Sequence, residues 1–443
     1  SAGLCLGTMS HALTVTTATA RAGDLRHADM VMLERTCGVS GGRSARGTQL
    51  RGSRLGCAPL AGVDLACADL SGAAVHGARL DGAKLSGATL RRTNLQSARM
   101  AGAQLVQANL YNASLPAAVL DGAWLDEANL EGARIRNAGL DGASARGARL
   151  RGANLMHAKA RGAVLDSADL TDASAPRLAL GGASLVGASL RGSDLQDMDG
   201  SGADFTKATL CGANLQKSRM CKSTLVASRC EGAKFTGARL PSSDLRNAGF
   251  SSATLDHADL RGCRARGAQL DGANISFADA QGADFTDVDA VEAVLERSQL
   301  QGASLERARL GRARLAGALG TGASFRDAEL READLRKAQL DRADLQGAQL
   351  HGAQLAGTNL EAAVMRGSQL QGAHAEACQL VHADLRGAEL RDVTLTGACF
   401  DGADLSGAHL DGSKLEAASL KIANLAGTTL EGGSGADAVL RGA

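Results

Sequence analysis

A large apolar residue recurs at every fifth position through most of this sequence. In residues 322–352 the recurring residues are Phe325, Leu330, Leu335, Leu340, Leu345 and Leu350. An Ala precedes each of them by two positions, and the remaining positions are polar, charged or Gly. A period of five matches neither the 3.6-residue period of a helix nor the two-residue period of a strand. The pattern therefore predicts a repeat architecture, in which each repeat is stabilised by stacking on its neighbours.

The phase of this repeat never shifts from Leu50 to Leu440, because every central position in that range is a multiple of five. A chain of 443 residues would ordinarily be divided into two or three domains. A linker between domains would shift the phase, so we expect one continuous rod over residues 48–443. Residues 1–47 follow the pattern poorly and are expected to form an N-terminal cap or extension. The alternative is the remnant of a transit or export segment, because residues 1–23 contain no Asp or Glu.

The composition excludes several classes of protein. Lys and Arg number 48 and Asp and Glu 47, which gives a net charge of +1. This balance argues against a protein that binds polyanions and equally against an acidic mimic of one. Aromatic residues make up 2 % of the chain, too few for a conventional core of this size. No apolar run approaches the roughly 18 residues that a membrane-spanning helix needs.

The run Ala-Asp/Asn-Leu followed by two further residues resembles the pentapeptide repeat family. The sequence reads ADLSGA at 68–73, ANLEGA at 128–133, ADLRKA at 333–338 and ADLSGA at 403–408. The resemblance covers about nine tenths of the chain and implies an all-β fold, a right-handed quadrilateral parallel β-helix. Four pentapeptides would form each coil, and the central residue and the small residue two before it would point inward.

The physical chemistry of such a coil agrees with the sequence. Coils stacked at roughly 4.8 Å, about 20 of them, would give a rod of roughly 95 Å. Each side must turn a corner, and Gly suits a corner that needs a positive φ. Gly is indeed favoured two positions after the centre, as at Gly72 and Gly82. Lys337 and Arg342 occupy the same position, so we expect that corners can also carry side chains.

Departures from the pattern are informative. Where the centre is small, an enlarged neighbour can fill the space: Leu178 follows Ala175, and Met198 precedes Gly200. Residues 216–230 place Ser218, Ser223 and Ser228 at three consecutive inward Ala positions, and their hydroxyls need hydrogen-bond partners. We therefore expect the most irregular part of the rod there.

The sequence carries no sign of catalysis. It contains no Ser-His-Asp order, nucleophile elbow, phosphate-binding loop or zinc signature. The ten Cys show no CxxC spacing, and the nine His mostly fall at outward positions. A four-sided helix with a filled interior also offers no substrate pocket. We expect no enzyme activity, no catalytic residue, no cofactor and no metal site.

Three surface features are candidates for binding partners. A basic collar consists of Arg134, Arg136, Arg146, Arg149, Arg151, Lys159 and Arg161, and an acidic collar of Asp279, Asp284, Asp287, Asp289, Glu292 and Glu296. An apolar surface consists of Trp124, Val164, Val106, Val186 and Val226 on one side of the rod, with Tyr111 on the neighbouring side. Solvated charge and scattered surface residues are the simpler interpretations. The functional interpretation is docking zones for proteins.

These features favour a non-catalytic scaffold, a rigid rod that docks protein partners as a subunit of a larger assembly. A homodimer through the bare C-terminal coil is an alternative partnership, because an uncovered parallel edge is a template for pairing. Some members of the pentapeptide repeat family mimic duplex DNA and bind type II topoisomerases. That activity implies a strongly negative rod, and it is our second hypothesis for this chain. A secreted or targeted effector is the third. We expect no specific nucleic acid and a soluble protein, in a plastid lumen or exported, or otherwise in the bacterial cytoplasm.

Overall fold

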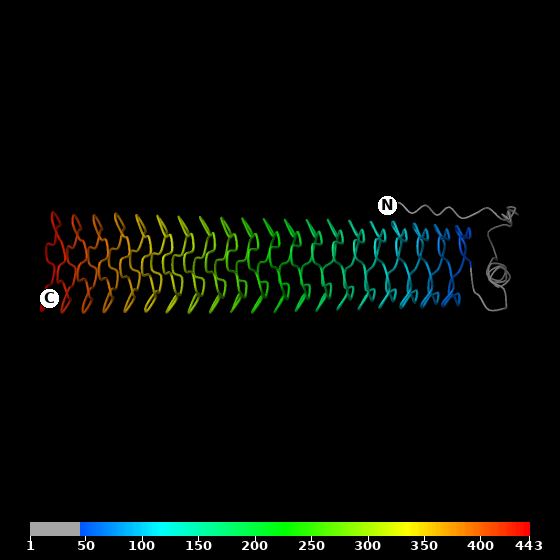
Figure 1. Cartoon of the computed structure of the whole chain (residues 1–443), viewed down its shortest axis with the longest axis horizontal. Coiled ribbons are helices and arrows are strands. Elements are labelled where there is room, and N and C mark those ends of the chain that lie inside the picture. The colour runs from blue at the N-terminus through cyan, green and yellow to red at the C-terminus, as the bar shows by residue number, and fades with distance from the viewer. Residues whose placement is uncertain (1–44) are drawn as a thin grey trace.

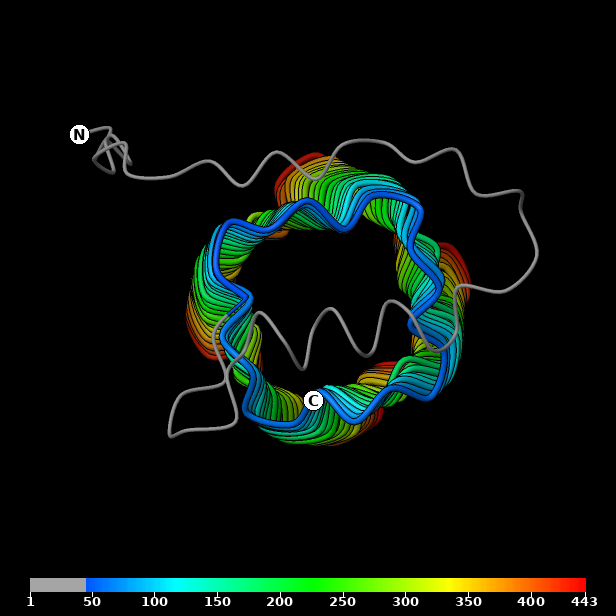
Figure 2. The same cartoon turned by 90° about the vertical axis from the view of Figure 1, so that its right-hand side faces the viewer.

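Residues 45–443 form one long rod of stacked coils (Figure 1). The computed structural model describes residues 45–443, and these contain no helix; the expectations for residues 1–44 lie outside the described part. The backbone pairs through parallel bridges of single residues, each joining a residue to the one 20 positions later, from Gln49↔Asp69 to Ser419↔Val439. Viewed along the axis, successive coils superpose around one closed outline (Figure 2). The four columns of bridges that begin at Gln49, Arg54, Pro59 and Asp64 define the first, second, third and fourth sides of the rod.

Hydrogen bonds between coils hold each side in register. The Leu70 N–H donates to the Thr89 carbonyl at 2.7 Å, and the Gly72 N–H donates to the Arg91 carbonyl at 2.8 Å. Within the coil, the Ala73 N–H donates to the Leu70 carbonyl at 2.9 Å and closes the turn. The same pattern repeats along the rod, so the backbone polar groups that face a neighbouring coil are paired with it.

Every corner of the rod has the same backbone conformation. The residue two positions after each centre has a positive φ from Gly47 to Gly442, whether or not it is Gly. Lys337 has a φ of 59° and Arg342 a φ of 58°, so corners do carry side chains. The stacking of the coils imposes the left-handed conformation even on residues that disfavour it.

The structure explains why Asp or Asn often precedes the central residue of a pentapeptide. The Ser71 N–H, at the start of a corner, donates to Asp69 Oδ1 at 2.9 Å. Thr171 and Asp169 repeat this contact at 2.9 Å. Asp and Asn side chains form such turns because they reach the backbone two residues further on. The Asp or Asn before the central residue therefore caps the corner that follows.

The interior consists of the central Leu and the small residue two before it, and nearly all of them are buried. Leu178 is 1 % exposed and Met198 is fully buried. A Cβ added to Gly200 would lie 3.1 Å from Met198 Cε, so the Met side chain takes the space that the small centre leaves. This contact is the volume compensation expected from the sequence.

Residues 216–230 are regular, and the expectation of an irregularity there is wrong. Bridges continue through this stretch in the same register. The Ser223 hydroxyl donates to the Met220 carbonyl at 2.7 Å, and the Ser228 hydroxyl lies 3.5 Å from Cys230 Sγ. Ser218 Oγ is buried without a hydrogen-bond partner. The Ser223 hydroxyl fits an Ala position because a central carbonyl is within reach inside the coil, whereas Ser218 shows that a hydroxyl is also tolerated there without a partner.

The last described coil is less covered than the rest. Leu430 is 51 % exposed and Leu440 is 57 % exposed, although both occupy central positions. Leu425, one pentapeptide before Leu430, is only partly buried against the core. Pairing of two copies through this coil stays a prediction.

Candidate partner-binding surface

Trp124 lies on the fourth side of the rod, where it is bridged to Gln104 on one adjacent coil and to Ser144 on the other. The position before a centre points outward, and Trp124 is 55 % exposed. None of the described residues stacks an aromatic or cationic group on its indole ring. The ring is therefore open to a partner.

All four Val residues of the predicted apolar surface share this side with Trp124, and Val226 lies about five coils further along. Val106, Val164 and Val186 are half-buried, and their coils lie within a few turns of the Trp124 coil. Tyr111 lies on the first side, which adjoins the fourth, and its ring carries the Arg91 guanidinium at 5.3 Å from the centroid. The structure thus brings the Val residues and Trp124 to one side, while Tyr111 already has a cation on its ring.

The basic collar is spread around the rod. Its predicted binding residues lie on three sides: Arg134 and Arg136 on the second, Arg146 on the fourth, and Arg149 and Arg151 on the first. Arg149 Nη2 lies 3.0 Å from Glu131 Oε2, and Arg151 Nη2 lies 3.9 Å from Asp172 Oδ2. Acids of adjacent coils therefore offset part of the charge that the sequence concentrates here.

The acidic collar is also paired with its neighbours. Asp287 Oδ1 accepts a hydrogen bond from Arg307 Nε at 2.7 Å, and Arg266 Nη2 lies 3.0 Å from Asp287 Oδ2. The hydrogen bond from Arg307 lowers the pKa of Asp287. Glu292 Oε1 lies 3.7 Å from Arg312 Nη1.

Two further members of the acidic collar, Asp289 and Asp284, differ from each other in their contacts. Asp289 is paired with Arg309 of the next coil. Asp284 has no ion pair among residues 45–443 and instead accepts a hydrogen bond from the Thr286 N–H at 3.0 Å. Asp284 is therefore the member whose charge is least offset.

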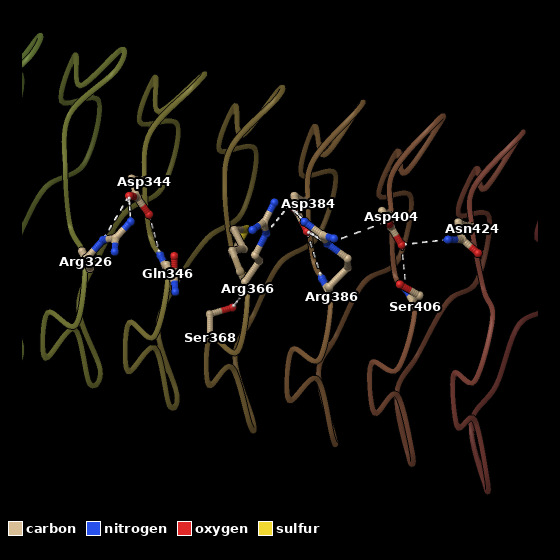
Figure 3. A network of polar contacts seen from close by, with 11 residues as sticks. Arg326, Asp344, Gln346, Arg366, Ser368, Asp384, Arg386, Asp404, Ser406 and Asn424 are labelled. Carbon is tan, nitrogen blue, oxygen red and sulfur yellow. Dashed lines mark hydrogen bonds and ion pairs between the residues drawn. The ribbon is translucent and has the colours of Figure 1, made fainter.

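Such pairing is the rule on the fourth side towards the C-terminal end (Figure 3). Arg326 donates to Asp344 of the next coil at 2.9 Å. Asp384 accepts hydrogen bonds from Arg366 of the preceding coil and from Arg386 of its own coil. Because residues 18 to 21 apart are neighbours, charge that looks concentrated along the sequence is alternating in space.

The first side of the rod carries a hollow that the sequence did not predict. Its volume is about 620 Å³, and Arg151, Arg191 and Arg229 are among the residues that line it. Gly192 and Gly212 leave its floor without side chains. Reading the sequence at intervals of 20 would have shown that Arg151 and Arg191 occupy the same position two coils apart.

Residues 45–443 hold no group of three or more His, Cys, Asp or Glu side chains placed to bind a metal ion. In the same range, no helix is long and apolar enough to cross a membrane. Burial lowers the pKa of His351, which favours its neutral form.

The family described as pentapeptide repeats matches this sequence over residues 46–175, 180–216 and 228–434, in overlapping segments. The unmatched residues 217–227 fall within residues 216–230, where the backbone nevertheless keeps its register. None of the curated proteins compared with the sequence matches it.

Several solved structures resemble the chain. HetL, a pentapeptide repeat protein involved in heterocyst differentiation regulation from the cyanobacterium Nostoc sp. strain PCC 7120, is 32 % identical over 54 % of this chain and 89 % of its own, with a TM-score of 0.20. A pentapeptide repeat protein from the Arabidopsis thaliana thylakoid lumen is 32 % identical over 24 % of this chain and 70 % of its own, with a TM-score of 0.17. QnrB1, a plasmid-mediated fluoroquinolone resistance protein, is 24 % identical over 49 % of this chain and 91 % of its own, with a TM-score of 0.19.

Proposed function

This chain belongs to the pentapeptide repeat family, and on that basis we propose that it is a non-catalytic rod that docks protein partners as a subunit of a larger assembly. Members of the family fold as right-handed quadrilateral β-helices. With about 20 coils at roughly 4.8 Å each, the rod would be roughly 95 Å long. A rod of this kind offers long flat sides and a filled interior, so its function is carried by outward side chains.

The observation that carries the proposal is the exposed indole of Trp124. A Trp that is 55 % exposed leaves a large apolar area in water, which is unfavourable unless a partner covers it. Trp is enriched among the residues that contribute most to binding between proteins. Val106, Val164 and Val186 extend the apolar area along the same side, so we propose that the partner contacts the fourth side around Trp124.

The charged collars are proposed as secondary contacts. Rim charges mainly steer association and select the partner, while buried aromatic anchors supply most of the affinity. Asp284 of the acidic collar and Arg134 of the basic collar are among the members that have no ion pair in residues 45–443, and we propose them for this role. Docking at Trp124 would then be modulated by salt.

DNA mimicry is less well supported than docking of a partner. A mimic needs a continuous negative surface, whereas the sequence has a net charge of +1 and Asp287, Asp289 and Glu292 each face an Arg. Supercoiling by purified DNA gyrase distinguishes the two functions. We expect no inhibition by the purified protein, and inhibition at micromolar concentration would favour the mimic.

The test of the proposal uses the tryptophan itself. The tagged full chain is purified from the organism that makes it, and each protein retained by the chain is then produced pure. Trp124 is the only Trp of the sequence, so the emission that remains after the partner's own fluorescence is subtracted reports contact at this position. We expect a blue shift on adding the partner, because the indole leaves water.

The matched control is Leu319, another exposed apolar residue, which lies on the third side. Trp124→Ser should weaken binding by about 2 kcal/mol or more, the loss typical of a central aromatic anchor, whereas Leu319→Ser should leave binding unchanged. The proposal is wrong if the chain purifies alone as a monomer or if Trp124→Ser retains its partner. A particle of twice the chain mass would instead favour pairing of two copies.

A further inference from the structure

We propose that the hollow on the first side is a binding groove for an acidic segment of a protein partner in the polyproline II conformation, with a carboxylate at every third residue. The proposal shares with the proposed function only the premise that the rod binds proteins. The groove lies on a different side from Trp124, so its failure would leave the docking at Trp124 untouched.

The groove results from the choice of residues at two neighbouring corners. Gly192 and Gly212 supply no side chain there, and Cys211 is small, so the surface is hollowed over these coils. Arg151 lies on an earlier coil and Arg229 on a later one, and both border the hollow. The result is an open trough along the axis of the rod with cationic side chains at both ends and Arg191 in the middle.

The positive charge of the groove is incompletely matched. Arg191 has no ion pair among residues 45–443. Arg151 lies 3.9 Å from Asp172, and both side chains are more than half exposed, so this pair is weak. Arg191 and Arg151 therefore keep guanidinium donors free for an oxyanion, and a guanidinium binds carboxylates with two parallel hydrogen bonds.

The far end of the groove is arranged differently. The Cys211 thiol donates to Glu231 Oε2 at 2.8 Å, and Arg229 Nε lies 3.4 Å from Glu231 Oε1. Burial, followed by the hydrogen bond to Glu231, raises the pKa of the Cys211 thiol. Glu231 is thus already engaged by two groups, and it leaves the outer donors of Arg229 to a ligand.

The spacing of the arginines selects the conformation of the ligand. Arg151 and Arg191 occupy equivalent positions two coils apart, which is roughly 9.6 Å at 4.8 Å per coil. A polyproline II helix advances roughly 9.3 Å per turn of three residues, so every third side chain points the same way at nearly this spacing. In a β-strand, residues three apart point to opposite faces. The coil edges are also occupied by bonds between coils, so a strand would find no backbone partners.

The charge pattern favours a peptide over a nucleic acid. Asp172 and Glu231 also line the hollow and would repel a continuous row of phosphates. A peptide can place carboxylates at the arginines and neutral residues beside Asp172 and Glu231. Proline-rich segments also lose little conformational entropy on binding, because they are extended beforehand.

Cys211 provides a direct readout of occupancy. Cys211 lies in the groove, and Cys221 is ten residues later, half a coil away, on the opposite side; both are half-buried. The full chain is treated with iodoacetamide at low ionic strength, and the alkylation rate of each Cys is followed by peptide mass spectrometry. The probe is a synthetic peptide that repeats Pro-Pro-Glu, and peptides that repeat Pro-Pro-Gln or Pro-Glu, and a duplex DNA, are the comparisons.

We expect the Pro-Pro-Glu peptide to slow alkylation of Cys211 about tenfold, the effect of roughly 1.4 kcal/mol of binding, and to leave Cys221 unchanged. Arg191→Gln should abolish this protection, whereas Arg79→Gln on the third side should retain it. Because the Arg191 side chain forms no ion pair among residues 45–443, its replacement should leave the midpoint of unfolding unchanged. Equal protection by the Gln peptide, stronger protection by the Pro-Glu peptide or by DNA, or protection that survives Arg191→Gln would overturn the proposal.

Discussion

The carboxylate of Asp384 accepts two hydrogen bonds from the guanidinium of Arg386, from Nε at 2.8 Å and from Nη2 at 2.9 Å (Figure 3). Arg366 of the preceding coil donates to the same carboxylate. The hydrogen bond from Arg386 holds the pKa of Asp384 at about 2, below its ordinary 3.8. The interaction therefore couples two coils and depends on the charge of one carboxylate.

Asp384→Asn should lower the free energy of unfolding by about 1–2 kcal/mol at neutral pH, after allowance for solvent screening. The pKa of Asp384 is lowered in the folded state, so its contribution is complete above the unfolded pKa and is lost as the pH falls through about 2. Urea unfolding measured between neutral pH and about pH 2 should show the two proteins converging at the acid end.

The control for this measurement is Asp327→Asn at an exposed corner, where the carboxylate has no ion pair among the described residues. This substitution should change stability by less than about 0.5 kcal/mol at every pH. A difference between wild type and Asp384→Asn that stays constant down to the acid end would show that the carboxylate charge is not the cause.

A small cavity beside Ala145 and Ala160 predicts a stabilising substitution. The cavity has a volume of about 20 Å³ and an entirely apolar lining, and although Leu178 belongs to that lining, space remains beside Ala145 and Ala160. Ala160→Val should raise the free energy of unfolding by about 0.5–1.5 kcal/mol, because it adds buried contacts without displacing others. Chemical denaturation measures the change.

Ala175→Val is the matched control for the cavity. Leu178 is buried beside this small centre and already takes its space, so the added methyl groups should overpack the coil and destabilise it by about 1–3 kcal/mol. Stabilisation at both positions, or at neither, would contradict the assignment of the cavity to Ala160.

The inward positions of the rod could be predicted from the sequence, but the partners of its outward charged side chains could not. The inward positions and the corner at Lys337 follow from a five-residue pattern that is local in the chain. Asp287, by contrast, looked like part of a continuous acidic collar in the sequence, yet it lies between Arg266 and Arg307. The partners of an outward side chain are 18 to 21 residues away, and the groove at Arg191 likewise exists only after the coils are stacked. Charge read along the chain therefore misjudges charge in space.

The buried thiols should be chemically inert in the folded protein. Burial raises the pKa of Cys230, Cys263 and Cys378 to about 12, so all three stay protonated at neutral pH. The thiolate is the reactive form. Iodoacetamide at neutral pH should label the exposed Cys57 and leave these three unmodified, as mass spectrometry of the digested protein will show. All of them should react in urea, and labelling of a buried thiol without denaturant would indicate that the coils open locally.

Ile422 is a β-branched residue at a corner that requires a left-handed backbone. Its φ is 53°, and it is 68 % exposed, so it contributes little packing in return for the strain. A left-handed conformation costs an L-residue roughly 1–2 kcal/mol, while Gly loses up to about 1 kcal/mol more chain entropy on folding.

Ile422→Gly should therefore raise the free energy of unfolding by about 0.5–1 kcal/mol, measured by chemical denaturation. Asn137→Gly at an equivalent corner, with a φ of 55°, should change stability little, because Asn already tolerates this conformation. If both substitutions had the same effect, the strain at a corner would not depend on the side chain, and the frequent Gly at this position would need a reason other than its backbone freedom.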